Sequence, residues 1–233
     1  MGVEWLVNFL FPKKCVNCGK VGSYVCEKCE VGLWEEEQIC PVCTRNSRYG
    51  LVHKYCHRSW GLDGLTCLWT YEGIARKIIK KAKYKFFYDI LSELTVSGSQ
   101  LTVRPEFTYF ERFLQEKPTV VPVPLWEGRE RWRGFNQAEI IGRSFATRHK
   151  LACNSHLLLR TRDTGHQTGR EREERLEAVK DAFKISNYSN LPNLPKNILL
   201  VDDVWTTGAT MSECCKILKQ NGGKNVWGLV LAR

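Results

Sequence analysis

Two adjacent carboxylates and a threonine-rich turn form the segment of this chain whose residue types point most clearly to chemistry. Asp202 and Asp203 follow four consecutive apolar residues, 198–201, and precede a turn made of Thr206, Thr207, Gly208, Ala209 and Thr210. Carboxylates accept hydrogen bonds from sugar hydroxyls, whereas threonine hydroxyls and free backbone amides donate to phosphate oxygens. Because Gly208 lets the backbone approach a ligand closely, the segment predicts a sugar-phosphate site.

The elements around this segment predict how it is positioned. An apolar run without alternation is typical of a central strand in a parallel sheet, and ligands of such sheets bind beyond the carboxyl ends of the strands. Apolar residues then recur at helical spacing from Met211 to Leu218, and Gly222 and Gly223 follow. We therefore expect a helix to begin within the threonine turn, with its amides and dipole directed at an anion. The alternative is an ordinary threonine cap beside two solvated acids.

A second basic segment follows another expected strand, 119–125. It contains Arg129, Arg131 and Arg133, and Gly134 to Gln137 then open a helix that is expected to run to about Lys150. A strand, a basic loop and a helix start predict a second anion site. The alternative is a basic surface loop that contacts no ligand.

The remaining middle segments give weaker predictions. Apolar residues at helical intervals predict one long helix from Gly73 to Leu94. The opposite face of this helix is either solvated or able to hold nucleic acid. Residues 95–118 are expected to form a variable linker or a short helix. The polar segment 160–175 has the composition of a mobile loop, either a closing lid or a plain surface excursion, in which His166 is a loop residue rather than a base. The residues of the opposite face are Lys77, Lys80, Lys81, Tyr84 and Tyr88.

Seven of the eleven cysteines lie in the first quarter of the chain and predict zinc. Two Cys-x-x-Cys pairs, seven residues apart, are able to surround one Zn²⁺ with four thiolates, from Cys15, Cys18, Cys26 and Cys29. A second site begins with Cys40, Cys43 and Cys56, but Ser59 stands where another Cys-x-x-Cys pair would end. The fourth ligand there is left open between His53, His57 and Cys67, with a metal-free remnant as the alternative.

Length and charge set the wider limits. A chain of 233 residues is able to hold one full α/β domain and a small module. The formal net charge of +10 favours polyanionic partners such as nucleic acid or phosphorylated metabolites. The start of the chain lacks the features of a signal peptide and no apolar run is long enough to span a membrane, so we expect a cytoplasmic protein without membrane insertion, in which paired cysteines bind metal.

Taken in order, these motifs closely resemble the ComF family of bacterial proteins, which are linked to DNA uptake in competence. The resemblance covers nearly the whole chain. It implies an α/β fold of the type I phosphoribosyltransferase class, a mainly parallel sheet with helices on both faces, in residues 67–233, after a double-zinc-ribbon-like module in residues 1–66. Two departures, Ser59 and Ala178, weaken the transfer of residue roles near those positions. The matching motifs are the Cys-x-x-Cys ribbons, Val121 to Leu125 with Arg133 to Gln137, Asp163 to Gln167, Glu174 to Leu176, Ala182-Phe183 and Val201 to Thr210.

The resemblance also implies a ligand and partners. The family pattern places 5-phosphoribosyl-1-pyrophosphate (PRPP), with Mg²⁺, in this site: Asp202 and Asp203 at the ribose, the threonine turn around the 5-phosphate, and Arg129 and Arg133 near the pyrophosphate. Single-stranded DNA and a competence helicase are the implied partners in DNA uptake. The alternative is an active PRPP-dependent phosphoribosyltransferase that modifies a nucleobase or another small acceptor in nucleotide metabolism. The sequence leaves open whether the chain is an enzyme.

Overall fold

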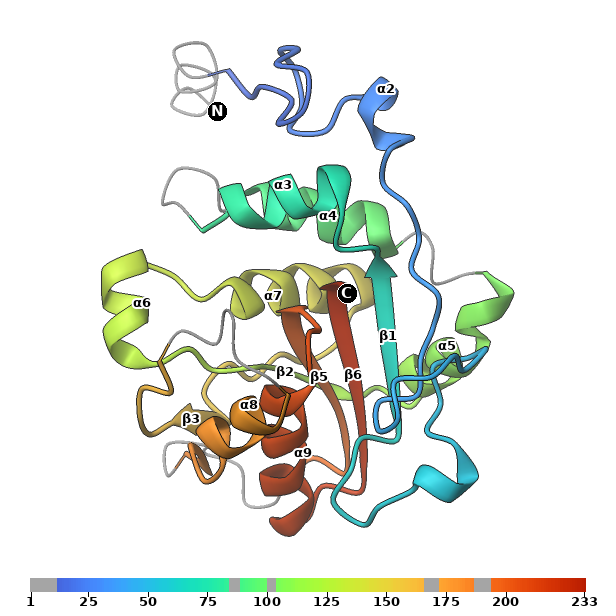
Figure 1. The fold of residues 1–233 in the computed structure, drawn as a ribbon, viewed down its shortest axis with the longest axis vertical. Coiled ribbons are helices and arrows are strands. Elements are labelled where there is room, and N and C mark those ends of the chain that lie inside the picture. The colour runs from blue at the N-terminus through green and yellow to red at the C-terminus, as the bar shows by residue number, and fades with distance from the viewer. Residues whose placement is uncertain (1–11, 84–88, 100–103, 166–171, 187–193) are drawn as a thin grey trace.

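The computed structural model describes residues 12–83, 89–99, 104–165, 172–186 and 194–233. Its elements follow one another along the chain as shown in Figure 1. In chain order they are α2 (Glu27–Glu30), η1 (Lys54–Cys56), β1 (Gly64–Trp69), α3 (Gly73–Lys81), α4 (Asp89–Ser99), η3 (Pro105–Phe107), α5 (Thr108–Gln115), β2 (Thr119–Pro122), α6 (Glu127–Arg133), α7 (Gln137–His149), β3 (Leu158–Arg160), α8 (Arg172–Val179), β4 (Phe183–Ile185), β5 (Asn197–Val204), α9 (Ala209–Gln220) and β6 (Asn225–Ala232).

Four parallel strands form the central sheet, in the order β1-β6-β5-β2. The expected strand at 198–201 is the buried centre of β5, which continues through the acid pair to Val204 because Asp202 and Val204 still pair with β6. Strands β3 and β4 form a separate antiparallel pair. A parallel arrangement buries both faces of the sheet, which explains the continuous apolar run in β5.

Helices cover both faces of this sheet, as predicted. Alternate residues of β5 and β6, such as Leu199 and Leu229, pack with α3, α4, α5 and α7 in one core cluster. The residues that point the other way, such as Ile198 and Val230, pack with α9 and the β3–β4 pair in a second cluster. Figure 1 shows the two layers on opposite sides of the strands. The predicted α/β fold class is therefore confirmed.

The cysteine-rich module extends along the edge of the sheet formed by β1 (Figure 1). Its first part packs on α3 and α4, since Cys15 and Cys29 share a core cluster with Ile74 and Leu91. Its second part forms isolated bridges to the two ends of β1. An exposed sheet edge is open to unwanted pairing, so the module also protects this one. The predicted boundary between residues 66 and 67 falls within β1.

The predicted helix from Gly73 to Leu94 is corrected to two helices, α3 and α4. Both bury residues at helical spacing in the same core cluster, including Ile74 and Ile78 on α3 and Ile90 and Leu94 on α4. Two helices that face one core repeat their apolar residues in the same way as one longer helix, so the break is invisible to periodicity. Residues 95–118 contain the end of α4, η3 and α5, in agreement with the short helix expected there.

The basic segment after β2 is also corrected, from a loop to helix α6. This helix buries none of its residues and gains support from Glu127, which accepts from Arg131 one turn later at 2.7 Å, and from a left-handed Gly134 at its end. The expected mobile loop 160–175 shortens, because β3 reaches Arg160 and α8 begins at Arg172. His166, Gln167, Tyr84 and Tyr88 lie outside the described residues. Within the described ranges, no helix has the length and apolar character required to cross a membrane.

Candidate functional site

A cavity of about 840 Å³ opens at the carboxyl ends of the parallel strands. Residues after three of the four strands line it: Tyr71 after β1, Pro124 after β2 and the threonine turn after β5. This is where open α/β sheets bind ligands. The structure brings together at this cavity all the residues that the sequence predicted for a sugar phosphate and a pyrophosphate, namely Asp202, Asp203, Thr206, Thr207, Gly208, Ala209, Thr210, Arg129 and Arg133.

The two carboxylates at the end of β5 lie close enough for their charges to repel each other. Burial raises the pKa of Asp202 to about 8, and the negative charge of Asp203 acts in the same direction. The backbone N–H of Asp203, which donates to Asp202 Oδ1 at 2.9 Å, and the more distant charge of Arg160 oppose this rise. A pair of this kind accepts hydroxyl donors or a cation readily, because either ligand lowers the cost of holding negative charge there.

The threonine turn places a helix start at the cavity. Gly208 adopts a left-handed conformation (φ 76°) as the N-cap of α9, which begins at Ala209. Thr207 Oγ1 accepts from the amide of Ala209 at a long 3.4 Å, and no side chain caps the helix. Because Ala209, Thr210 and Met211 all line the cavity, the weakly satisfied amides of the first turn lie beside it, as an anion site requires.

Three arginines from two elements line the same cavity. Arg129 and Arg133 come from α6, and Arg160 ends β3. Burial lowers the pKa of Arg133 and of Arg160, and the charge of Arg129 lowers both further. Of these three arginines, only Arg129 forms an ion pair within the described residues, with Asp163 at 3.3 Å. Because these positive charges repel one another, a polyanion bound in the cavity would stabilise them.

Four buried donors at this cavity lack acceptors within the described part of the chain. They are Arg133 Nε, Gln137 Nε2, Arg160 Nε and Trp205 Nε1, and each belongs to a lining residue. An unpaired buried donor costs about 1–3 kcal/mol, so buried polar groups are rarely left without partners. All four groups are donors, so acceptor oxygens of a ligand or of water would satisfy them.

Several lining residues were not identified from the sequence as part of the site. Arg160 and Gln137 are the most important, because both carry one of the unpaired donors. Arg160 follows the apolar run 157–159, which indicates the end of a strand. This is the only local signal in the sequence that could have identified Arg160 as a site residue. Asn136 has a positioning role: it caps α7 through the amide of Ala138 and donates to Val123 O at 3.0 Å.

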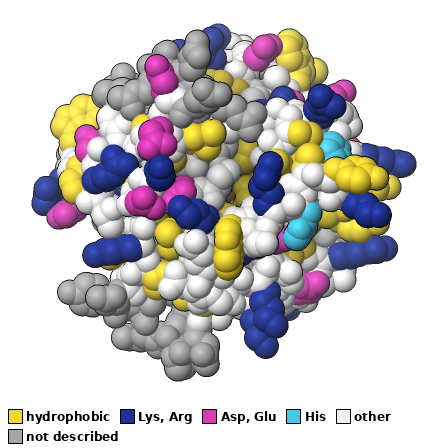
Figure 2. Space-filling model, turned by 60° about the horizontal axis from the view of Figure 1, so that its bottom comes forward, with side chains coloured by type: hydrophobic (Ala, Val, Ile, Leu, Met, Phe, Trp, Pro, Cys, Tyr) yellow, Lys and Arg dark blue, Asp and Glu magenta, His cyan; other side chains and the backbone are white. Residues whose placement is uncertain are grey.

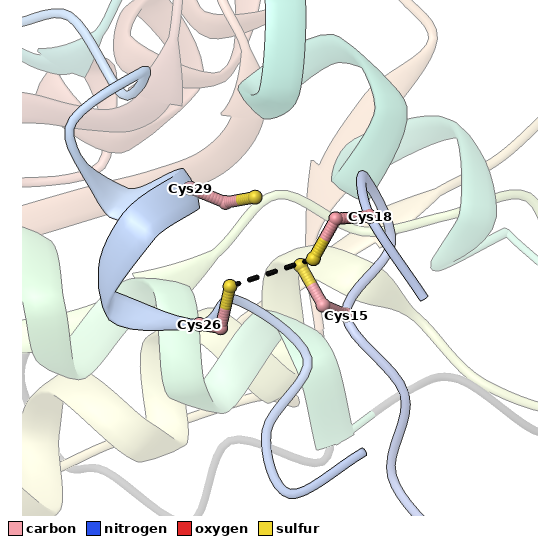
Figure 3. Close-up of side chains that lie close together, drawn as sticks. All are labelled: Cys15, Cys18, Cys26 and Cys29. Atoms are coloured by element: carbon pink, nitrogen blue, oxygen red, sulfur yellow. Dashed lines mark hydrogen bonds between the residues drawn. The ribbon is translucent and has the colours of Figure 1, made fainter. Parts of the chain in front are cut away.

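The first cysteine cluster gathers the predicted ligands Cys15, Cys18, Cys26 and Cys29, whose sulfur atoms all lie within 4.8 Å of one another. Figure 3 shows the four side chains converging: Cys15 and Cys18 come from the loop before α2, Cys26 is the N-cap of α2 and Cys29 lies within it. Burial acts to raise the pKa of the Cys15 thiol, but hydrogen bonds from surrounding backbone amides outweigh it and lower this pKa to about 6. A thiolate so stabilised fits tetrahedral Zn²⁺ coordination.

The second cluster consists of Cys40, Cys43, His53 and Cys56, with ligand atoms within the same 4.8 Å limit. His53 therefore supplies the fourth position that the sequence left open. Its Nδ1 lies 3.3 Å from Cys43 Sγ, while its Nε2 faces Asn46 O at 3.1 Å. If Nε2 carries the proton and donates to that carbonyl, Nδ1 is free to bind metal. Cys67, which lies within β1, and His57 are both outside the cluster.

Comparisons with known proteins agree with this arrangement. Residues 6–58 match a double zinc ribbon domain. The chain is 28% identical to the DNA utilization protein YhgH of Escherichia coli over 88% of its length and 89% of that protein. It is 26% identical to Competence protein ComFC of Bacillus subtilis over 94% of its length and 85% of that protein. Competence protein F of Haemophilus influenzae is 33% identical, over 48% of the chain and 50% of that protein.

Proposed function

The chain belongs to the ComF family, and from this premise we propose that it is a DNA-uptake protein that binds PRPP and single-stranded DNA. The names of its relatives, which refer to competence and DNA utilisation, support the cellular role. The net charge of +10 supports a polyanionic partner. A competence helicase that handles the same DNA is the protein partner we propose.

The observation that carries the PRPP proposal is the set of four unpaired buried donors. Arg133, Gln137 and Trp205 hold three of them, and Arg160 holds the fourth at the end of β3. PRPP supplies the oxygens these donors need, at its pyrophosphate on one end and its 5-phosphate on the other. In this pose the helix start at α9 binds the 5-phosphate, and Arg129, Arg133 and Arg160 bind the pyrophosphate.

The acid pair fits the middle of the same ligand. In this pose Asp202 and Asp203 accept hydrogen bonds from the ribose hydroxyls, which offset the burial and the repulsion by Asp203 that raise the pKa of Asp202. Carboxylate oxygens are also ligands that Mg²⁺ accepts, directly or through water. Mg²⁺ bound with PRPP would neutralise pyrophosphate charge. The protein's own contribution is to orient the ribose between two anchored ends.

An active phosphoribosyltransferase is the second candidate, and the size of the cavity favours it. A volume of about 840 Å³ is near the upper end of the range for small-molecule sites, roughly 300–1,000 Å³, and a transferase must hold an acceptor beside PRPP. In the reaction the acceptor nucleophile forms a bond to ribose C1 while the bond from C1 to pyrophosphate breaks. The lining residues stabilise the leaving charge rather than act as a strong base.

Thermal unfolding with ligands tests the PRPP proposal directly. At 100 times its Kd, a ligand of the folded state adds about 2.7 kcal/mol, which in a chain of this size is a Tm rise of roughly 5–10 °C. We expect that rise with PRPP and Mg²⁺, and smaller rises with ribose 5-phosphate or pyrophosphate, which occupy one end only. Asp202→Asn with Asp203→Asn should abolish most of the PRPP effect. A wild-type protein whose Tm does not respond to PRPP would contradict the proposal.

A screen of acceptors then separates the two candidates. PRPP-dependent release of pyrophosphate, measured with nucleobases and other small acceptors, is expected from a transferase and is not expected from a protein that only binds PRPP. Release that survives the double substitution would show that the reacting site lies elsewhere.

A further inference from the structure

The second knuckle, residues 38–62, carries a surface that neither the metal cluster nor the cavity explains. Its side chains include Arg45, Arg48, Lys54 and Arg58, and the sequence has no Asp or Glu between Glu37 and Asp63. All four cations are exposed. A zinc ion with three thiolates offsets only part of this charge, so the surface remains positive.

Two aromatic side chains lie exposed on the same segment. Tyr55 is 97% exposed and Trp60 is 49% exposed, although aromatic residues usually bury most of their area. Tyr55 belongs to η1, between the ligands His53 and Cys56, so the metal cluster holds its backbone in place. Figure 2 shows hydrophobic, basic and histidine side chains gathered at the right of the face, where Figure 1 places this knuckle.

Trp60 also lines a groove of about 410 Å³, whereas Tyr55 lies outside it on the same segment. Arg58 and Trp60 form its wall on the knuckle side, and Leu176 and Val179 of α8 form the apolar wall opposite. Leu176 is itself 42% exposed. Lys216 and Glu213 of α9 line the same groove and pair with each other at 3.0 Å. The groove therefore has apolar walls. Arg58 also lines it, and this side chain forms no ion pair within the described residues.

Proteins that bind single-stranded nucleic acid without sequence preference use basic side chains along the phosphate backbone and aromatic rings that stack on the bases. We propose that the second knuckle and its groove are the single-stranded DNA site of this protein, with Tyr55 and Trp60 stacking on bases and Arg48, Lys54 and Arg58 contacting phosphates. This inference rests on the DNA-binding part of the proposed function. A duplex hides its base faces, so the site prefers single strands.

The groove also adjoins the PRPP cavity. Ala209, the first residue of α9, lines both. DNA in the groove therefore lies on the other side of the helix start proposed to hold the 5-phosphate, and the two ligands occupy separate sites.

Fluorescence anisotropy with a labelled oligothymidine tests the assignment at low salt. Each stacked base contributes about 1–3 kcal/mol, so Tyr55→Ala and Trp60→Ala should each weaken binding by roughly 5- to 150-fold, whereas Trp60→Phe should retain most of it. Trp34→Ala is the matched control, since Trp34 is 60% exposed in the same module but outside the groove. Unchanged zinc content and Tm would show that the variants fold.

Charge is tested separately. Arg48→Gln with Arg58→Gln should reduce the slope of log K against log salt by about 1.4, because each phosphate contact on a single strand contributes about 0.7. If the wild-type protein binds DNA and the aromatic and charge variants bind equally well, the location is wrong while the DNA-binding proposal stands. If the wild-type protein binds no single-stranded DNA at low salt, both are wrong, and PRPP binding remains a separate question.

Discussion

The indole ring of Trp205 lies so close to Gly208 that a Cβ atom on Gly208 would approach its Cζ2 atom to 2.2 Å. Trp205 is buried, and its backbone N–H donates to Ala232 O at 2.9 Å, so the ring has little freedom to move aside. The end of β5 and the start of α9 are thereby locked together at the position where we propose that the 5-phosphate binds.

We expect Gly208→Ala to abolish the Tm response to PRPP and to lower the free energy of unfolding by about 2–4 kcal/mol, from the clash and from a φ of +76°. The control is Gly222→Ala, because Gly222 has a φ of +109° but nothing within 4 Å of the added Cβ. It should lose stability through backbone strain alone and keep the response to PRPP. Equal ligand responses in the two variants would exclude Gly208 from the binding site.

Arg160 should be more important for the ligand than for the fold. Its guanidinium packs over the Phe183 ring at 5.5 Å, but its Nε has no acceptor among the residues that the structure describes. Its pKa is lowered by burial and by the charge of Arg129. We expect Arg160→Gln to change the free energy of unfolding by no more than about 1 kcal/mol while removing most of the Tm rise with PRPP. Arg131→Gln is the control, since Arg131 is exposed and pairs with Glu127. A normal PRPP response in Arg160→Gln would contradict the pose.

Asp202 should make the protein less stable as pH rises. Its pKa is raised from 3.8 to about 8 in the folded state, so the folded protein holds a proton that the unfolded chain releases. The resulting stabilisation is fully present below about pH 4 and is lost as pH rises through about 8, with a size on the order of a few kcal/mol.

Urea unfolding between pH 5 and pH 8.5 measures this effect. Asp202→Asn does not ionise, so it should gain stability relative to the wild type as pH rises, and the difference between the two proteins removes contributions from other groups. Asp203→Asn removes the neighbouring negative charge and should move the decline to lower pH. A constant difference between Asp202→Asn and the wild type across this range would show that Asp202 titrates near its ordinary pKa.

The sequence predicted those features that depend on local patterns. The apolar run before Asp202, the helix after Gly208 and the spacing of Cys15 and Cys18 each describe one element, and the structure contains all of them. The ligand proposed for the cavity stays a prediction, because the geometry shows the donors and not their partner.

Features that depend on how distant segments meet could not be predicted. Arg160 reaches the cavity because β3 pairs with β4, where it lies opposite Phe183. Helix α6 forms without a buried face, so no periodicity marks it. His53 is the second cluster's fourth ligand because the chain folds back from Cys43, and spacing alone did not distinguish it from His57 or Cys67.

Substitutions of the two histidines test the second metal site. His53→Ala should reduce the zinc content from two ions per chain to about one, or weaken the second site by orders of magnitude, since three ligands leave a coordination position open. His53→Cys should restore binding, and His57→Ala is the matched control, because His57 is exposed and lies outside the cluster. Zinc content is measured by metal analysis after dialysis against a weak chelator. If His57→Ala loses zinc and His53→Ala does not, the assignment of His53 as the fourth ligand is wrong.

Gln38 should be the residue that most strongly joins the module to the sheet. Its buried side-chain amide donates to Cys67 O at 2.8 Å and accepts from Cys67 N at 3.0 Å, so it pairs with the open edge of β1 as another strand would. Gln38→Met keeps the length but leaves both backbone groups of Cys67 without a protein partner. Because each unpaired buried group costs about 1–3 kcal/mol, we expect the free energy of unfolding to fall by about 2–5 kcal/mol. Gln115→Met, on the exposed side of α5, should change it by less than about 0.5 kcal/mol. If Gln38→Met proves as mild as Gln115→Met in urea unfolding with zinc present, the edge of β1 is satisfied by water and the module is held mainly by its packing on α3 and α4.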